Sequence, residues 1–317
     1  MGVASGSGLP VLAVTLPQFN VDPGPALEAC RDAHRVGFGG AFVFDHLWPL
    51  GAPTRPALEC WTLLAAVAAE VGGRAGGAGG FRVGTLVTRA GLRAPALVAR
   101  MAATVGQVAG VPPIVAVGRG DLGNRDENRA FGLPFGGAAE RSRAVEDTVA
   151  ALRGPLAGSR PTGAPPWGSP DPSGAPEVWV GGTGPSGREL AGRLADAWNG
   201  WGLTPEELAA GLTAVRRAAA EAGRDPATVA GTWGGQVLVA PQPAQAEAML
   251  ARWGTGRPPG EVARVIAGTP ETVLARLRAL GDAGAAWCVL AFVGGPAARM
   301  RALLAEAAGL PARARIA

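Results

Sequence analysis

The sequence of 317 residues contains no lysine, no tyrosine, only two histidines and only three cysteines. All 29 basic side chains are therefore arginines, and no run of five occurs, whereas proteins that bind nucleic acids usually cluster their positive charge. The formal net charge is only +4. We therefore expect no nucleic-acid partner.

Long apolar runs are also missing. No run approaches the roughly 18 residues that a membrane-spanning helix needs, and no basic segment precedes the first short apolar run. We expect no membrane partner, no signal peptide and a cytoplasmic location. Cys30, Cys60 and Cys288 lie far apart with no CxxC pair, so they match neither a zinc site nor a disulfide framework. We predict that they are buried structural thiols.

Several short motifs of known chemistry are absent. The sequence has no GxGxxG and no P-loop pattern, which argues against a nicotinamide Rossmann site and against an NTPase. No GxSxG motif occurs, and no Ser–His arrangement can be assigned. No cluster of His, Cys, Asp and Glu has metal-ligand spacing. Asp45 and His46 are neighbours, but adjacent residues on a strand point to opposite faces, so we predict no metal site.

What the sequence does contain is a regular alternation of short apolar runs and longer amphipathic runs. Hydrophobic residues make up 48% of the chain, which is typical of a well-buried globular protein. The apolar runs predict eight strands, at 10–17, 40–45, 81–88, 112–120, 176–182, 196–202, 231–240 and 286–295. The runs with helical spacing predict eight helices, at 23–37, 55–73, 94–110, 137–154, 185–195, 204–223, 269–284 and 297–309.

Eight strands that alternate with helices imply a parallel sheet, and eight such units favour a closed (β/α)8 TIM barrel with loop insertions. A doubly wound open sheet is the alternative. We predict a single domain over residues 1–317. The segment 154–176 is rich in proline and glycine and joins a helix to a strand, so we expect a surface loop on the bottom face of the barrel.

The ends of the predicted strands carry the candidate chemistry, because the active site of such a barrel lies at the carboxyl ends of its strands. "VGGTGPSGREL" places glycines before a helix whose first N–H groups suit a phosphate. "VGRGDLGN" is a second glycine-rich end, with Arg119 beside it. Together they favour a phosphate-bearing cofactor.

The two histidines receive different interpretations. His34 lies within a helix on the outer layer, where a structural or solvent-facing role is expected. His46 follows a strand at its carboxyl end, where an imidazole can exchange a proton near neutral pH. We predict that His46 is functional.

The strand ends, taken in order, resemble the luciferase-like monooxygenase family, whose fold is a (β/α)8 barrel that holds FMN or the deazaflavin coenzyme F420 at its mouth. The likeness covers nearly the whole chain. The Asp45-His46 pair is similar to the branch that uses coenzyme F420 for hydride transfer. The motifs that carry the resemblance are "GFGGAFVFDHLWP", "ECWTLLAAVAAEV", "VGTLVTRAGLRAPALVARMAATV", "VAVGRGDLGNRDENRAFGLPF", "VWVGGTGPSGRELAGRLADAWNGW" and "AGTPETVLARLRALGDAGAAWCVL".

The resemblance implies roles for individual residues. His46 would handle the proton that accompanies the hydride, Asp45 would orient its turn, and Trp48 would line the substrate side. Asp121 matches a catalytic Glu of some members but is one methylene shorter, so its role as an acid is open. The remaining matches are cofactor contacts: Leu86-Val87 at a non-prolyl cis peptide, Gly118, Gly120 and Asn124 at the strand-four mouth, and Gly181, Gly182, Thr183 and Gly184 at the phosphate turn.

These expectations define an F420-dependent oxidoreductase that moves a hydride between the deazaflavin and a small organic substrate, by reducing C=C or C=N or by oxidising an alcohol. The absence of lysine disfavours a sugar-phosphate substrate, and the apolar stretch 48–50 suits an apolar or heterocyclic one. The alternatives are an FMN-dependent monooxygenase and a barrel that binds a flavin without catalysis. The resemblance also implies a homodimer.

Overall fold

The computed structural model describes residues 8–49, 51–72, 80–154 and 174–313. Its strands form one parallel sheet in the order β6-β5-β4-β3-β2-β1-β9-β7, and a further pairing of β6 with β7 closes the ring. The predicted TIM barrel is therefore confirmed, and the open doubly wound alternative is wrong. Most of the expected surface loop at 154–176 lies outside the described residues.

All eight predicted strands are present, in the predicted order. They are β1 (Val11–Thr15), β2 (Gly40–Val43), β3 (Arg82–Arg89), β4 (Ile114–Gly118), β5 (Glu177–Gly181), β6 (Ala197–Trp201), β7 (Ala230–Val239) and β9 (Ala285–Phe292). The sequence analysis missed a three-residue strand, β8 (Ile266–Gly268). It pairs with the carboxyl end of β7, at Val237–Val239, whereas β9 pairs with β7 only as far as Val237.

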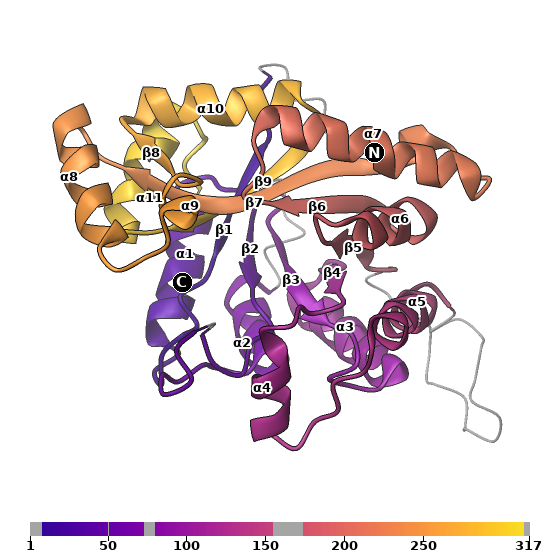
Figure 1. Cartoon of the computed structure of the whole chain (residues 1–317). Coiled ribbons are helices and arrows are strands. Elements are labelled where there is room, and N and C mark those ends of the chain that lie inside the picture. The colour runs from indigo at the N-terminus through magenta and orange to yellow at the C-terminus, as the bar shows by residue number, and fades with distance from the viewer. Residues whose placement is uncertain (1–7, 50, 73–79, 155–173, 314–317) are drawn as a thin grey trace.

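The eight predicted helices are also present, although the second begins at Cys60 rather than at residue 55. They are α1 (Gly24–Arg35), α2 (Cys60–Val71), α3 (Pro95–Ala109), α5 (Ala138–Arg153), α6 (Pro185–Leu194), α7 (Pro205–Glu221), α10 (Pro270–Asp282) and α11 (Ala297–Ala307). Figure 1 shows the helices outside the strands. Four further helical segments were not predicted, namely α4 (Asn124–Ala130), η1 (Pro226–Thr228), α8 (Pro243–Gly254) and α9 (Pro259–Val262).

Two apolar cores hold the barrel together. The larger lies between the strands and the surrounding helices. The smaller fills the inside of the barrel, where Phe42 stacks on Trp179 with ring centroids 5.4 Å apart and Trp287 packs against both. A closed barrel of eight strands is just wide enough to be filled by side chains, so ligands bind at its mouth rather than in a pore.

The three cysteines are buried and free, as predicted. Burial raises the pKa of the Cys30 thiol to about 12 and also raises the pKa of Cys60 and of Cys288. His34 packs edge-on against Phe81, with ring centroids 5.3 Å apart. Among the described residues, no helix is both long enough and apolar enough to cross a membrane.

Candidate active site

The chain that leaves β2 is held in place by a buried glutamine. The Gln18 side chain donates to the Phe44 carbonyl oxygen at 2.8 Å and accepts from the Phe44 N–H. Gln18 is completely buried and follows β1, so it ties the ends of two neighbouring strands together. This tie sets the backbone from which Asp45 and His46 project in opposite directions.

Asp45 points into the protein. Its Oδ2 accepts from Thr88 Oγ1 and the Arg89 N–H, both at 2.9 Å, and from Arg93 Nη1 at 2.7 Å. The side chain is 1% exposed. Thr88 in turn accepts from the indole of Trp61 on α2 at 3.0 Å. Through these contacts Asp45 joins the end of β2 to the end of β3.

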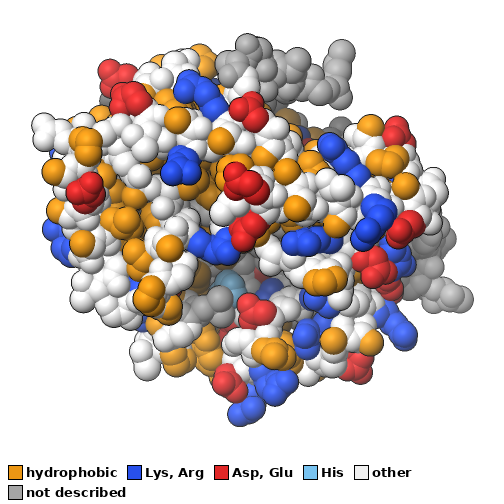
Figure 2. Space-filling model, turned by 45° about the horizontal axis from the view of Figure 1, so that its top comes forward, with side chains coloured by type: hydrophobic (Ala, Val, Ile, Leu, Met, Phe, Trp, Pro, Cys, Tyr) orange, Lys and Arg blue, Asp and Glu red, His pale blue; other side chains and the backbone are white. Residues whose placement is uncertain are grey.

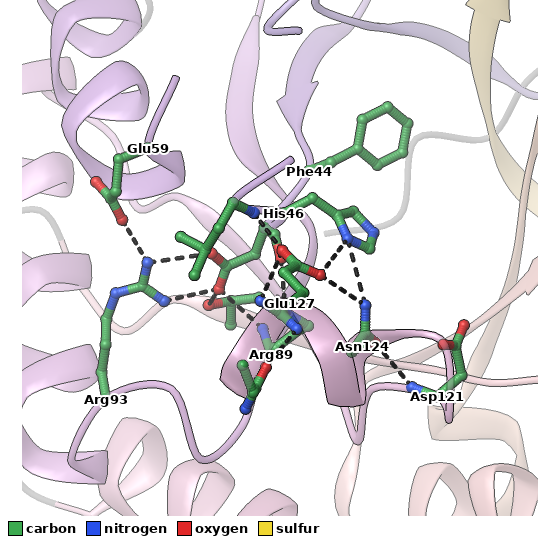
Figure 3. Close-up of polar contacts among 12 residues, drawn as sticks. Phe44, His46, Glu59, Arg89, Arg93, Asp121, Asn124 and Glu127 are labelled. Carbon is green, nitrogen blue, oxygen red and sulfur yellow. Dashed lines mark hydrogen bonds and ion pairs between the residues drawn. The ribbon is translucent and has the colours of Figure 1, made fainter. Parts of the chain in front are cut away.

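His46 points the other way, and its side chain is 20% exposed. Its Nδ1 lies 3.4 Å from Glu127 Oε2 and 3.4 Å from Asn124 Nδ2, and both partners come from α4 (Figure 3). Phe19 lies beside the imidazole, with ring centroids 6.5 Å apart. Figure 2 shows a hollow on one face of the molecule, with a histidine visible inside it among charged side chains.

Glu127 is completely buried and carries most of the polar contacts around His46. Arg89 Nη2 donates to it at 3.0 Å, and the Leu47 N–H donates to the same oxygen. Burial by itself raises the pKa of Glu127, but the bonds from His46 and Leu47 and the charge of Arg89 outweigh it, so the pKa lies below its usual value. The group is therefore a carboxylate at neutral pH.

The ends of β3, β4 and β5 meet at one side chain. The Leu86–Val87 peptide is cis, at a break in the register between β3 and β4. A Cβ at Gly118 would lie 2.4 Å from a methyl of Val87, and one at Gly181 would lie 2.7 Å from the other methyl. The lack of a side chain at both positions thus leaves space for Val87, so packing alone accounts for these two glycines. Leu86 is buried inside the barrel.

A cavity of about 240 Å³ opens beside these strand ends, between the β3 and β4 loops and the start of α5. Arg119 and Arg141 line it together with Gly120, Asn124 and Phe135. The guanidinium of Arg141 lies over the Phe135 ring at 4.6 Å, and within the described residues its buried Nε has no hydrogen-bond partner. Arg89 and Glu140 also line the cavity, so three cationic groups face one acid, and this excess of positive charge together with the unused donor of Arg141 suits an anionic group.

The predicted phosphate turn lies at the start of α6. Gly182 has φ +139°, a left-handed conformation, while Gly184 is the extended residue just before the helix, and a Cβ there would meet nothing within 4 Å. Thr183 and Gly184 are exposed. The first N–H groups of a helix have no intrahelical partner, so this open turn suits an anionic group.

Two predicted catalytic residues stand apart from His46. Asp121 is exposed, and only its backbone N–H joins the cluster of Figure 3, by donating to Asn124 Oδ1 at 2.9 Å. Trp48 packs against Phe131 just after α4, with ring centroids 5.9 Å apart. Asn124 touches both His46 and the arginine cavity, so it links two parts of the site that the sequence analysis treated separately.

The sequence analysis missed Glu127, Arg89 and Arg93. Arg93 bonds to Asp45 and to Glu59, and Arg89 bonds to Glu127, Asn128 and the Asp45 carbonyl oxygen. The sequence did contain a pattern that could have indicated Glu127. Asn124, Glu127 and Asn128 are polar residues with the i, i+3, i+4 spacing of one helical face.

The profile of the luciferase-like monooxygenase family matches residues 12–262, which is most of the chain. The chain belongs to the luciferase-like monooxygenase family. Curated relatives include phthiodiolone/phenolphthiodiolone dimycocerosates ketoreductases, one from Mycobacterium tuberculosis (30% identical over 72% of this chain and 55% of the relative) and one from Mycobacterium kansasii (30% identical over 65% and 53%). The chain thus spans about half the length of these relatives. The family match and the ketoreductase relatives support an oxidoreductase enzyme.

Solved structures share the luciferase-like fold at low identity. An F420-dependent secondary alcohol dehydrogenase in complex with an F420-acetone adduct superposes with a TM-score of 0.77 at 19% identity, covering 94% of this chain and 98% of the other. The EDTA monooxygenase from Chelativorans sp. BNC1 superposes with a TM-score of 0.74 at 17% identity, covering 95% and 94%. At these identities the likeness shows the fold alone.

Proposed function

We propose that this luciferase-like protein is an F420-dependent oxidoreductase that interconverts an apolar ketone and its alcohol. The observation that carries the proposal is that Asn124 belongs both to the arginine cavity and to the surroundings of His46. A cofactor held in the cavity would therefore lie next to the imidazole.

The cavity suits the phosphate of such a cofactor. Arg119 and Arg141 supply positive charge to it, and the buried Nε of Arg141 supplies a free donor. The turn at Gly184, which does not line this cavity, leaves separate space for an anionic group at the start of α6. A deazaflavin, when bound, supplies or accepts the hydride. FMN carries a phosphate too, so the cavity by itself is compatible with the monooxygenase alternative.

The imidazole of His46 provides the other half of the reaction. Reduction of a ketone needs a hydride at carbon and a proton at oxygen, and oxidation of the alcohol needs a group to take that proton. His46 delivers and removes it, since an imidazole works in both directions near neutral pH. The ketoreductase relatives and the alcohol dehydrogenase of similar fold favour this reaction over C=C or C=N reduction.

Aromatic side chains around the imidazole favour an apolar substrate. Phe19 stacks on Phe44 at 6.1 Å, and Trp201, which ends β6, packs edge-on against Phe44 at 5.6 Å. Leu122 and Phe131 are more than half exposed on either side of α4. A substrate that covered these groups would remove apolar surface from water, which contributes about 25 cal/mol per Å².

Titration of the purified protein with F420 and with FMN, followed by tryptophan fluorescence, tests the cofactor. F420 should bind more tightly, and Arg141→Met should weaken its binding by at least about tenfold, or 1.4 kcal/mol. The matched control is Arg143→Met, which changes an exposed arginine on the same helix and should leave cofactor binding normal.

Turnover of reduced F420 with ketones of increasing chain length tests the substrate. Tighter binding of FMN with oxygen consumption would overturn the proposal in favour of a monooxygenase.

A further inference from the structure

The imidazole of His46 shares one buried carboxylate with three other hydrogen-bond donors. Glu127 Oε1 faces the Leu47 N–H and Arg89, while Oε2 faces His46 Nδ1 and Asn124 Nδ2, the latter at 3.0 Å. Asn124 Oδ1 accepts from the Asp121 N–H at 2.9 Å, so its amide nitrogen must turn toward Glu127. Three of the four neighbours can therefore only donate to the carboxylate.

His46 is the one neighbour of Glu127 whose ring nitrogen can either donate or accept a hydrogen bond. The Nδ1 of a neutral imidazole is a donor in one tautomer and an acceptor in the other. If it accepts, its partner is the neutral amide of Asn124 at 3.4 Å; if it donates, its partner is the carboxylate of Glu127 at the same distance. Hydrogen bonds to an ionised acceptor are about twice as strong as those between neutral groups. The donor state is therefore favoured.

The charges around Glu127 point the same way. Arg89 and Arg93 are bonded to three carboxylates, those of Glu127, Asp45 and Glu59. Two positive groups against three negative ones leave one negative charge in excess, at a place where Glu127 and Asp45 are almost completely buried. A proton held at His46 Nδ1 places the positive end of an N–H dipole against that excess.

We propose that Glu127 is a positioning residue that keeps a proton on Nδ1 of His46, so that Nε2 is the atom that exchanges protons with a ligand at the barrel mouth. Neutral His46 then offers an unprotonated Nε2 to the hydroxyl of an alcohol. After it takes the proton, the imidazolium lies against the Glu127 carboxylate, and in the reverse direction Nε2–H donates to a carbonyl oxygen. This catalytic consequence rests on the proposed function, whereas the tautomer does not.

The tautomer is measurable because the chain has only two histidines. Long-range ¹H–¹⁵N spectra of the ligand-free protein report which ring nitrogen carries the proton, and His34→Gln identifies the signals of His46 by removing the others. We expect neutral His46 to be protonated at Nδ1. Protonation at Nε2 would overturn the proposal, whatever cofactor the protein uses.

Glu127→Gln gives a sharper test. Leu47 N–H and Arg89 cannot accept, so they retain the single amide oxygen, and the new NH2 group faces His46 and takes the place of the oxygen to which Asn124 Nδ2 donated. Its Nδ1 must then accept, and the proton moves to Nε2. With F420 and a ketone or alcohol substrate, kcat should fall by about 10²-fold or more, because a histidine in the wrong tautomer loses its proton transfer. The Kd of the cofactor should change by less than about twofold, against the tenfold expected for a lost phosphate contact.

Two further variants separate positioning from folding. Glu127→Asp keeps the carboxylate and should retain the wild-type tautomer and part of the activity. Asp126→Asn makes the same chemical change one residue away, where the side chain is 78% exposed, and should alter neither readout. A Glu127→Gln protein that keeps its Nδ1 proton or its kcat would overturn the proposal. If Glu127→Gln does not fold, the wild-type spectrum still decides. A wild-type protein inactive with F420 but protonated at Nδ1 refutes only the proposed function.

Discussion

His46 and Asp45 are adjacent in sequence but take part in different interactions. Asp45 is bonded on every side by Thr88, Arg89 and Arg93, whereas the imidazole is the partly exposed end of the Glu127 cluster. Replacing Asp45 would remove the buried acceptor that the Arg93 guanidinium, the Arg89 N–H and the Thr88 hydroxyl share, and would disturb folding. Replacing His46 removes a group at the rim, so its effect on chemistry can be separated from its effect on stability.

At the residue scale we therefore predict that His46→Ala lowers kcat by about 10²–10⁴-fold, the usual contribution of a positioned acid or base. The melting temperature should stay within a few degrees of the wild-type value, and cofactor affinity should change little. Steady-state kinetics across pH 6–8, with His34→Ala as the matched control, is the measurement. Near-normal turnover by His46→Ala would leave Asp121 as the next candidate for the acid or base.

The turn between β5 and α6 shows how an element presents backbone groups to a ligand. Its glycines are not equivalent. Gly181 makes room for Val87, and Gly182 has φ +139°, so valine at Gly182 would strain the backbone itself. Gly184 has an extended backbone and open space around its Cα, so a side chain there tests the ligand site alone.

At the element scale we predict that Gly184→Val weakens binding of the phosphate-bearing cofactor by at least about tenfold, roughly 1.4 kcal/mol. The branched side chain fills the space in front of the first N–H groups of α6. The circular dichroism spectrum should stay native. Gly260→Val, in α9 and also open, is the control. Unchanged affinity in Gly184→Val would remove the turn from the cofactor site.

Helix α4 marks the limit of what the sequence predicts about this site. Strands and helices with apolar faces were found because hydrophobic periodicity reports burial against a core. The buried face of α4 consists instead of Asn124, Glu127 and Asn128, and the helix has only seven residues. Its partner Arg89 is the last residue of β3, so the ion pair that buries Glu127 exists only once the barrel has closed.

For the whole molecule, the same logic explains why the barrel was predictable and its decorations were not. Eight apolar strands must be covered on both faces, which leaves few architectures. The short strand β8 and helices α8 and α9 add to one end of β7, and nothing in their apolar pattern requires them. The positions of His46, Asn124 and the glycine turn before α6 follow from the barrel, whereas the contact between His46 and Asn124 depends on the loops.

Two carboxylates, the buried Glu127 and the partly exposed Glu59, make the stability of the molecule depend on pH. Burial alone raises the pKa of Glu59 and of Glu127, but the bonds from Thr62 to Glu59 and from His46 to Glu127, with the nearby arginines, bring both below the ordinary 4.5. A pKa that is lower in the folded state than in the unfolded state means that the folded protein holds fewer protons. The resulting stabilisation is complete above about pH 4.5 and is lost as the pH falls below it.

At the scale of the whole molecule we predict that the free energy of unfolding falls on acidification from about pH 5 to about pH 3. Urea denaturation at several pH values measures it. Glu127→Gln should be less stable at neutral pH but should show a smaller loss over the acid range, since it has one fewer carboxylate to protonate. An equal loss in both proteins would show that Glu127 does not contribute to the acid sensitivity.

The filling of the barrel by Phe42, Trp179 and Trp287 has a consequence for the order of events in turnover. With the lumen occupied by side chains, a molecule bound over His46 has no exit through the opposite end and must use the opening by which it entered. If the proposed cofactor lies beneath the substrate, it departs only after the product. Steady-state kinetics of the ordered type, with the cofactor binding first and leaving last, follow from that single entrance.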